Sequence, residues 1–188
     1  MAILPICIKG EPVLHTPAAP VTEFDEALRT LVQDMYETMD AAPGVGLAAP
    51  QVGVGLRLFV YSYETPEGEP WRGVAINPTL LISPAEPGEP DEDIESEGCL
   101  SFPGERFPLR RAERAVLTAV DLDQNPVHLD VTGWRARILQ HEYDHLDGYL
   151  YVDRLGPGDW KTQDRLTRKY RWGVPGLSWT PGEDDIDA

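Results

Sequence analysis

Hydrophobic residues recur at helical spacing in two parts of the chain. Between residues 25 and 41 the apolar positions are three or four residues apart, which predicts an amphipathic helix. A second helix is predicted from Trp134 to Leu146, because the pattern ends near Gly148 and glycine stops helices. The second apolar stripe also carries ionisable residues, whereas Arg135 and Arg137 fall outside it. The first stripe consists of Leu28, Leu31, Val32, Met35 and Met39, and the second of Trp134, Ile138, His141, Glu142 and His145.

Four shorter apolar stretches predict β-strands. Residues 56–61 and 74–82 form the first pair, and Pro78 implies an edge strand or a bulge because proline has no N–H to donate. Residues 114–120 and 127–131 flank the turn sequence Asp-Gln-Asn-Pro, which predicts a hairpin. We therefore predict an α+β fold in which antiparallel β-sheets wrap around a central helix, the one ending at Leu146.

Three polar segments complete the outline. Residues 83–97 contain three prolines and seven acidic residues, which predicts a mobile acidic loop that serves only as a spacer. Residues 161–171 carry five cationic side chains against one acid, which predicts a short helix with a basic side. Residues 173–188 are rich in glycine, proline and acids. We interpret residues 1–172 as one catalytic domain and residues 173–188 as a tail.

Composition narrows the class of protein. The chain of 188 residues is long enough for one stable core, and its net charge of −16 disfavours DNA or general nucleic-acid binding. No apolar run has membrane length, and no signal-peptide pattern is present. Cys7 and Cys99 lie far apart, as in proteins of a reducing compartment, so we expect a cytoplasmic protein. Cys7 has no neighbours that suggest chemistry and is expected to be a small buried hydrophobe.

The predicted second helix contains the sequence His-Glu-Tyr-Asp-His at residues 141–145. Histidines four apart lie on one helix face, so His141 and His145 can bind one metal ion. Glu142 lies beside them, where it can take a proton from a metal-bound water. The alternative is a helix with two buried histidines and no metal.

A hydrolytic metal site needs a third protein ligand and an open position. No histidine follows His145, and the one later glutamate, Glu183, lies in the polar tail. Cys99 lies upstream, and its thiolate would suit zinc or ferrous iron; it could instead be a small buried hydrophobe. Four downstream aspartates also remain candidates: Asp147, Asp153, Asp159 and Asp164.

Three stretches, in chain order, resemble the signature motifs of peptide deformylases. They are GVGLAAPQVG at residues 44–53, EGCLS at residues 97–101, and HEYDH at residues 141–145. The resemblance covers roughly the first 155 residues. The closing sequence RWGVPGLSW, at residues 171–179, is similar to the tails of actinobacterial members.

The resemblance implies a hydrolase that removes the formyl group from the N-terminal formyl-methionine of newly synthesised polypeptides and releases formate. It implies Cys99, His141 and His145 as metal ligands, with Glu142 as general acid and base. Gln51 and the backbone N–H of Leu100 would stabilise the oxyanion. The implied metal is one divalent ion, Fe²⁺ in the cell, which Zn²⁺, Ni²⁺ or Co²⁺ can replace.

The glycine-rich motif predicts where a peptide binds. Gly44 and Gly46 flank Val45, so a substrate backbone can approach closely and lie as an added strand. We expect Val45, Ile138 and the edge of the His141 ring to contact the methionine side chain. The resemblance places Arg106 near the substrate entrance, and a plain surface arginine is the alternative. Gly104 occupies a place where the family often has a glutamate, so that contact at the pocket rim is not predicted.

Residues 161–171 give one further hypothesis and its alternative. Their basic side could contact ribosomal RNA near the peptide exit, or it could simply be a solvated surface. Two other functions also remain open at this point. One is a metallopeptidase that shares HExxH but uses a downstream aspartate, and the other is a non-catalytic binding module stabilised by a metal.

Overall fold

The computed structural model describes residues 2–64, 68 and 70–184. Its α-helices are α1 (Glu26–Ala41), α2 (Gly133–Leu146) and α3 (Pro157–Lys169), and its short 3-10 helices are η1 (Pro12–His15), η2 (Ala49–Val52) and η3 (Tyr151–Arg154). Its strands are β1 (Ile6–Cys7), β2 (Gly46–Ala48), β3 (Leu58–Glu64), β4 (Pro70–Ile82), β5 (Ser96–Cys99), β6 (Phe102–Pro108), β7 (Arg114–Val120), β8 (Pro126–Thr132) and β9 (Ser178–Trp179).

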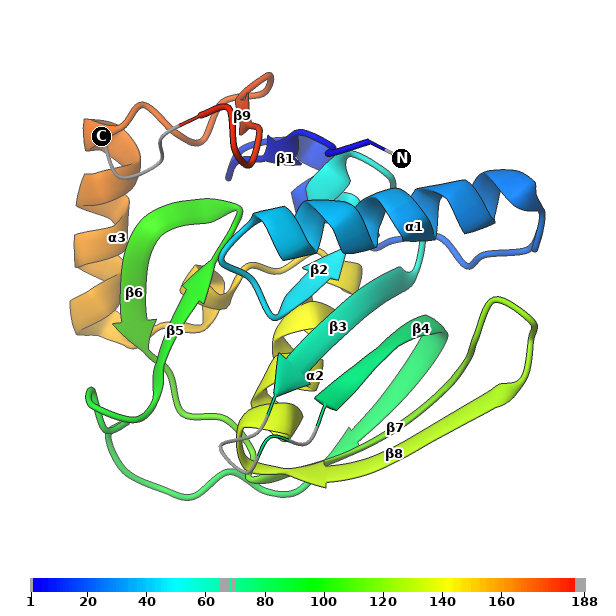
Figure 1. Cartoon of the computed structure of the whole chain (residues 1–188). Helices are drawn as coiled ribbons and strands as arrows, with labels where there is room; N and C mark the ends of the chain where they lie inside the picture. Colours follow the sequence, from blue (N-terminus) through cyan, green and yellow to red (C-terminus); the bar gives the residue numbers. More distant parts are fainter. Residues whose placement is uncertain (1, 65–67, 69, 185–188) are drawn as a thin grey trace.

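The main sheet is antiparallel, with strand order β2-β3-β4-β7-β8, so β2 is an edge strand. Helix α2 contacts β2, β3 and β7 of this sheet (Figure 1). Two small sheets, β5-β6 and β1-β9, complete the antiparallel pairing. The predicted α+β fold, with antiparallel sheets around the helix that carries HExxH, is confirmed.

Helix α1 forms where the first apolar stripe predicts it. Asp25 caps the helix by accepting a hydrogen bond from the Leu28 N–H at 2.9 Å, which satisfies a backbone donor that has no partner within the helix. The apolar face of α1 is buried in one core cluster together with β2 and β3. The buried positions are Leu28, Val32, Met35, Thr38 and Met39.

Strand β4 contains the irregularity that Pro78 predicts. Its register with β7 shifts between Ile76 and Thr79. Asn77 has a φ of 51°, in the left-handed region, and its side chain bonds the Val21 N–H at 2.8 Å and the Val21 carbonyl at 2.9 Å. The two hydrogen bonds of Asn77 therefore hold the bulge against the chain segment before α1. The predicted hairpin also forms, as β7 and β8.

Two details of the predicted second helix are wrong. Trp134 is 40% exposed, although it belongs to the apolar stripe. Arg137 is buried, although it falls outside that stripe, because Glu97 neutralises its charge and the Leu109 carbonyl accepts from it at 2.7 Å. Helix α2 is therefore buried on more of its circumference than its hydrophobic pattern indicates.

The acidic segment at residues 83–97 is not merely a spacer. Its backbone carbonyls at Glu86 and Glu89 accept hydrogen bonds from Arg110. Glu95 also pairs with Arg110, and Glu97 is buried within β5. The end of the segment therefore contributes ion pairs to the interior.

Part of the predicted tail packs against the N-terminal segment. Trp179 of β9 pairs with Ile6 of β1 and is 5% exposed, and the Gly173 N–H donates to the Lys9 carbonyl at 2.8 Å. Figure 1 shows β9 (red) beside β1 (blue). Residues 185–188 of the predicted tail lie outside the described residues, and the division of the chain at residue 172 stays a prediction. None of the described helices combines the length and apolar character needed to span a bilayer.

Candidate metal centre

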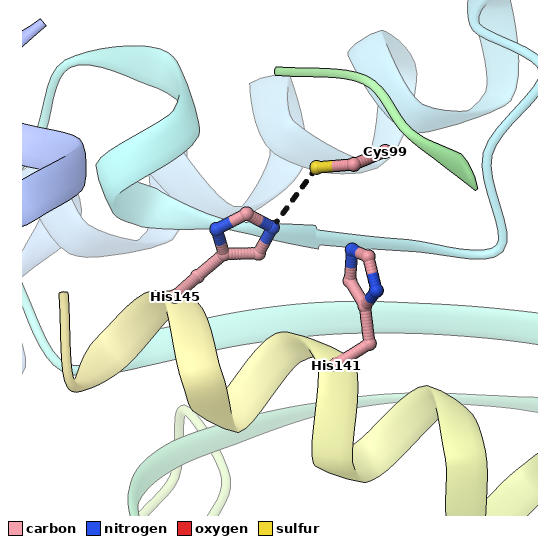
Figure 2. Close-up of side chains that lie close together, drawn as sticks. All are labelled: Cys99, His141 and His145. Carbon is pink, nitrogen blue, oxygen red and sulfur yellow. Dashed lines mark hydrogen bonds between the residues drawn. The ribbon is translucent and has the colours of Figure 1, made fainter. Parts of the chain in front are cut away.

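Three potential metal ligands converge from two distant parts of the chain. Cys99 ends β5, and His141 and His145 lie one turn apart on α2, with both rings directed toward the sulfur (Figure 2). Their ligand atoms all lie within 4.8 Å of one another. The Cys99 Sγ is 3.3 Å from His145 Nε2. The structure thus brings together the thiolate and the two imidazoles that the sequence predicts.

This donor set fits a divalent metal ion. With Zn–S and Zn–N bonds of about 2.3 and 2.0–2.1 Å, tetrahedral ligands lie about 3.5 Å apart, close to the observed sulfur–nitrogen separation. The Nδ1 of His141 is hydrogen-bonded to the Glu97 carboxylate at 3.0 Å. The other ring nitrogen of His141, Nε2, is therefore the one that can bind a metal. Burial holds the pKa of His145 well below its ordinary value, so this imidazole is neutral and has a lone pair to offer.

Glu97 contacts one of the candidate ligands, and the sequence analysis did not single it out. It is buried, and its carboxylate accepts hydrogen bonds from Arg111 at 2.8 and 2.9 Å and from Arg137 at 2.7 Å, besides its contact with His141. Burial opposes its ionisation, but these hydrogen bonds and charges hold the pKa of Glu97 well below its usual range. The one available signal was its position two residues before Cys99, within the motif EGCLS.

Asp144 of α2 extends this network of ion pairs. Arg111 also donates to Asp144 at 2.6 Å, and Arg154 donates to Asp144 at 2.7 Å. Buried charges are costly unless they are paired, and here Glu97 and Asp144 each meet two arginines. The network therefore fixes the orientation of His141 relative to the rest of α2.

Glu142 lies beside the ligand group, in a confined place. It is 4% exposed, and its Oε2 is buried with no hydrogen-bond partner among the described residues. A Cβ placed on Gly46 would lie 2.2 Å from Glu142 Oε1, so only glycine leaves room for this carboxylate. Burial raises the pKa of Glu142 to about 7, while the nearby His141 acts in the opposite direction. A carboxyl group with this pKa can both accept and donate a proton near neutral pH.

Gln51 is held in one orientation by the backbone. Its Oε1 accepts a hydrogen bond from the Ala48 N–H at 2.9 Å, so its Nε2 is the end that faces the metal ligands. That amide nitrogen lies 3.7 Å from Cys99 Sγ and 3.3 Å from Ser101 Oγ. Gln51 is 1% exposed, and it therefore presents a fixed, desolvated N–H donor at the site.

One pocket joins these groups. The candidate ligands Cys99 and His141 lie in its wall, and His145 does not. Arg106 contributes to the pocket wall with its guanidinium bonded to the Ser96 carbonyl at 2.7 Å, which fixes the side chain. The other predicted site residues that line this pocket are Gly44, Val45, Gly46, Gln51, Leu100, Ile138 and Glu142.

The downstream aspartates do not join the ligand group in the part of the chain that the structure describes. Asp147 pairs with Arg57 at 2.8 Å, Asp153 accepts from the Leu150 N–H at 2.8 Å, and Asp164 pairs with Arg168 at 2.8 Å. Cys99 therefore completes the set that the sequence left open. Cys7 lies outside this group and is half-buried.

Comparison with known proteins places this arrangement in a family. Residues 3–160 match the family model described as "Polypeptide deformylase". Over 190 residues the chain is 52% identical to the peptide deformylase of Mycolicibacterium paratuberculosis, a match that covers 97% of this chain and 96% of that protein.

Solved structures agree with the sequence match. The crystal structure of a peptide deformylase from Legionella pneumophila superimposes with a TM-score of 0.77 at 39% identity, covering 90% of this chain and 96% of that chain. A structure of the Acinetobacter baumannii class I type b peptide deformylase with Met-Ala-Ser bound superimposes with a TM-score of 0.71 at 36% identity, covering 81% and 98%.

Proposed function

The chain belongs to the polypeptide deformylase family, and we propose that it removes the formyl group from the N-terminal formyl-methionine of newly synthesised polypeptides, releasing formate. The observation that carries this proposal is the convergence of Cys99, His141 and His145 beside the buried carboxylate of Glu142. The products of the reaction are formate and a free amine, so the site must activate water and supply one proton to the leaving group.

A divalent metal held by these three ligands would act as a Lewis acid and make hydroxide available at neutral pH. Glu142 accepts the proton of the attacking water at its carboxylate and later delivers it to the departing amine nitrogen. Its buried Oε2 has no competing hydrogen-bond partner among the described residues, and its raised pKa suits both halves of this transfer.

Negative charge on the former carbonyl oxygen needs fixed donors. The Nε2–H of Gln51 and the backbone N–H of Leu100 serve this role in our proposal, and each such donor is worth about 3 kcal/mol in the transition state. The backbone contact of Gln51 with Ala48 supports the assignment, because it keeps the amide nitrogen, and not the amide oxygen, toward the site.

The peptide binds along β2 in this proposal. Strand β2 is the edge of the main sheet, so one side of the segment at Gly44–Gly46 has backbone groups to offer to an added strand. Val45 is 41% exposed, and Ile138 lines the same pocket, so the two supply apolar contacts for a methionine side chain. The relative from Acinetobacter baumannii was solved with Met-Ala-Ser bound. Backbone recognition suits an enzyme that accepts many different proteins.

From membership of the family we assign Fe²⁺ as the metal in the cell. Zn²⁺, Ni²⁺ or Co²⁺ can replace it in this proposal, because one thiolate and two imidazoles suit all four ions. Dioxygen oxidises ferrous iron, and with it the Cys99 sulfur bound to that iron. Protein purified without air should therefore lose activity on exposure to air, and protein loaded with Ni²⁺ should keep it. If both forms kept their activity equally well in air, the assignment of iron would be contradicted.

Two further proposals concern place and partners. Because its substrate is a nascent chain, we propose that the enzyme works in the cytoplasm, beside the ribosome. Helix α3 supports a ribosome contact, because five exposed cationic residues gather on it and just after it: Lys161, Arg165, Arg168, Lys169 and Arg171.

Co-sedimentation tests the ribosome contact. Replacing the five cationic residues of α3 and its end by glutamine should abolish co-sedimentation with ribosomes at low salt. A control variant with glutamine at the exposed Arg29, Arg72 and Arg114 should still co-sediment. Unchanged binding of the five-residue variant would overturn the contact.

The formate released from formyl-Met-Ala-Ser tests the main proposal. Metal-loaded enzyme should release one formate for each new amino group. Acetyl-Met-Ala-Ser, which differs in the acyl group alone, controls for general amide hydrolysis and should be a much poorer substrate. Cleavage between the residues of the peptide, with the formyl group intact, would instead indicate a metallopeptidase, and no reaction would favour a non-catalytic binding module.

A further inference from the structure

The turn between β5 and β6 accepts hydrogen bonds from segments near both ends of the chain. Cys99 and Phe102 face each other across this hairpin, so Leu100 and Ser101 form its turn. The Ser101 carbonyl accepts a hydrogen bond from the Lys9 N–H at 2.8 Å. The Leu100 carbonyl accepts one from the indole Nε1–H of Trp179, also at 2.8 Å. Figure 1 shows β1 and β9 lying above this hairpin.

The indole is a rigid donor. Trp179 is 5% exposed and belongs to the core cluster that also contains Ile6 and Ile8. Its strand is paired with β1, and the Ile8 N–H donates to the Leu177 carbonyl at 2.9 Å, so the backbone around the indole is also held. The ring can therefore neither rotate nor withdraw without opening the core.

The side chain of Leu100 is confined from the opposite direction. A Cβ placed on Gly44 would lie 2.9 Å from Leu100 Cδ1, so the leucine packs closely over the glycine-rich segment. Ser101 is completely buried, and its Oγ lies 3.3 Å from Gln51 Nε2. Leu100, the proposed oxyanion donor, thus has its side chain confined by Gly44 and its carbonyl held by Trp179.

We propose that Trp179 is a positioning residue, whose indole N–H orients the turn so that the Leu100 N–H points at the developing oxyanion. This inference rests on the proposed function, in which the Leu100 N–H stabilises that charge. An oxyanion donor acts only when it is aligned before the reaction, and a small misplacement lowers the rate. The C-terminal segment therefore contributes to catalysis without touching the substrate.

Trp179→Phe tests the role, because phenylalanine keeps an aromatic ring in the core and removes the donor. Rates are measured with formyl-Met-Ala-Ser and normalised to bound metal. We expect kcat to fall about fivefold, the effect of one lost hydrogen bond, with KM unchanged, because the Leu100 donor acts on the transition state. In the metal-free protein, the Leu100 carbonyl ¹³C resonance should move upfield when its hydrogen bond is lost.

Glu11→Ala is the matched control. The Glu11 carboxylate accepts from the Gly176 N–H at 2.6 Å, so this variant removes another anchor of the same segment without touching the turn. We expect wild-type kcat and an unchanged Leu100 carbonyl resonance. If Trp179→Phe folds poorly, site-specific incorporation of a benzothienyl analogue at position 179 removes the N–H and keeps the ring shape.

The outcomes are distinct. Wild-type kcat in a Trp179 variant whose Leu100 carbonyl resonance has moved would overturn the positioning role. An equal loss of kcat in Glu11→Ala would show that attachment of the segment matters, and not the indole hydrogen bond, and would also overturn it. An inactive wild-type enzyme would overturn the proposed function itself, and with it any catalytic role for Trp179.

Discussion

The carboxylate of Glu97 lies 3.0 Å from Nδ1 of His141. This contact fixes which ring nitrogen of His141 is left for a metal, and it links the ligand group to two buried arginines, Arg111 and Arg137. A carboxylate that orients a metal-binding histidine also raises the basicity of that histidine. The ligand geometry therefore depends on a residue that is not itself among the three ligands.

Replacing Glu97 by glutamine should weaken metal binding and destabilise the fold. The amide keeps the shape but removes the negative charge that Arg111 and Arg137 share, so that Asp144 and Glu95 are their remaining carboxylate partners; breaking buried ion pairs of this kind costs about 3–5 kcal/mol. Metal affinity should fall about 10- to 100-fold, as measured by competition with a chelator. Glu95→Gln is the control, because Glu95 pairs with Arg110 and Arg137 but has no contact with His141 among the interactions described. Equal metal affinity in the two variants would contradict this role for Glu97.

Glu142→Gln should separate metal binding from catalysis. Because the amide cannot accept a proton, formate release should fall by about 10² to 10⁴, the usual range for a general base. Metal content should stay at the wild-type level, since Glu142 is not one of the three ligands. Glu105→Gln, in the wall of the same pocket, should keep most of the activity. Full activity in Glu142→Gln would remove Glu142 from the mechanism.

Gly46→Ala tests the confinement of Glu142. The added methyl group would lie 2.2 Å from Glu142 Oε1, so the carboxylate must move away from its place beside the ligands. We expect a loss of kcat of at least about tenfold with the metal still bound. Gly55→Ala is a matched control, because its Cβ would meet only Val13 Cγ2, at an ordinary 3.8 Å. Wild-type kcat in Gly46→Ala would show that the carboxylate tolerates displacement.

Cys99→Ala should remove one of the three ligands and leave the protein largely metal-free after dialysis. Cys7→Ala is the internal control, because Cys7 lies outside the ligand group. Metal content per chain is measured by elemental analysis after purification without air. Retention of a full equivalent of metal in Cys99→Ala would favour a site that draws its third ligand from elsewhere in the chain.

Periodicity and motifs predict the parts of this protein that depend on local sequence. The apolar spacing of α1 and α2 and the turn between β7 and β8 each reflect contacts within a short segment. The convergence of Cys99 with the two histidines was predicted only from the resemblance of the motifs to a known family. Hydrophobic patterning does not show which distant segment packs against a given helix.

Features that depend on tertiary pairing were not predictable in the same way. Arg137 is charged and off the apolar stripe, so only the presence of Glu97 across the interface makes its burial favourable. The sequence analysis counted Glu97 with the acidic segment, because its partners are distant in the sequence. They include Arg111, between β6 and β7, and His141, on α2. The pairing of Ile6 with Trp179 joins the two ends of the chain, and two-residue strands carry no periodic signal.

X-ray absorption at the zinc edge of the zinc-loaded enzyme tests the central claim most directly, because it reports the atoms bound to the metal. Our account predicts one sulfur at about 2.3 Å, together with two imidazole nitrogens at about 2.0–2.1 Å, for the zinc-loaded form. A spectrum with nitrogen and oxygen neighbours and no sulfur would contradict it, because Cys99 would then not be a ligand.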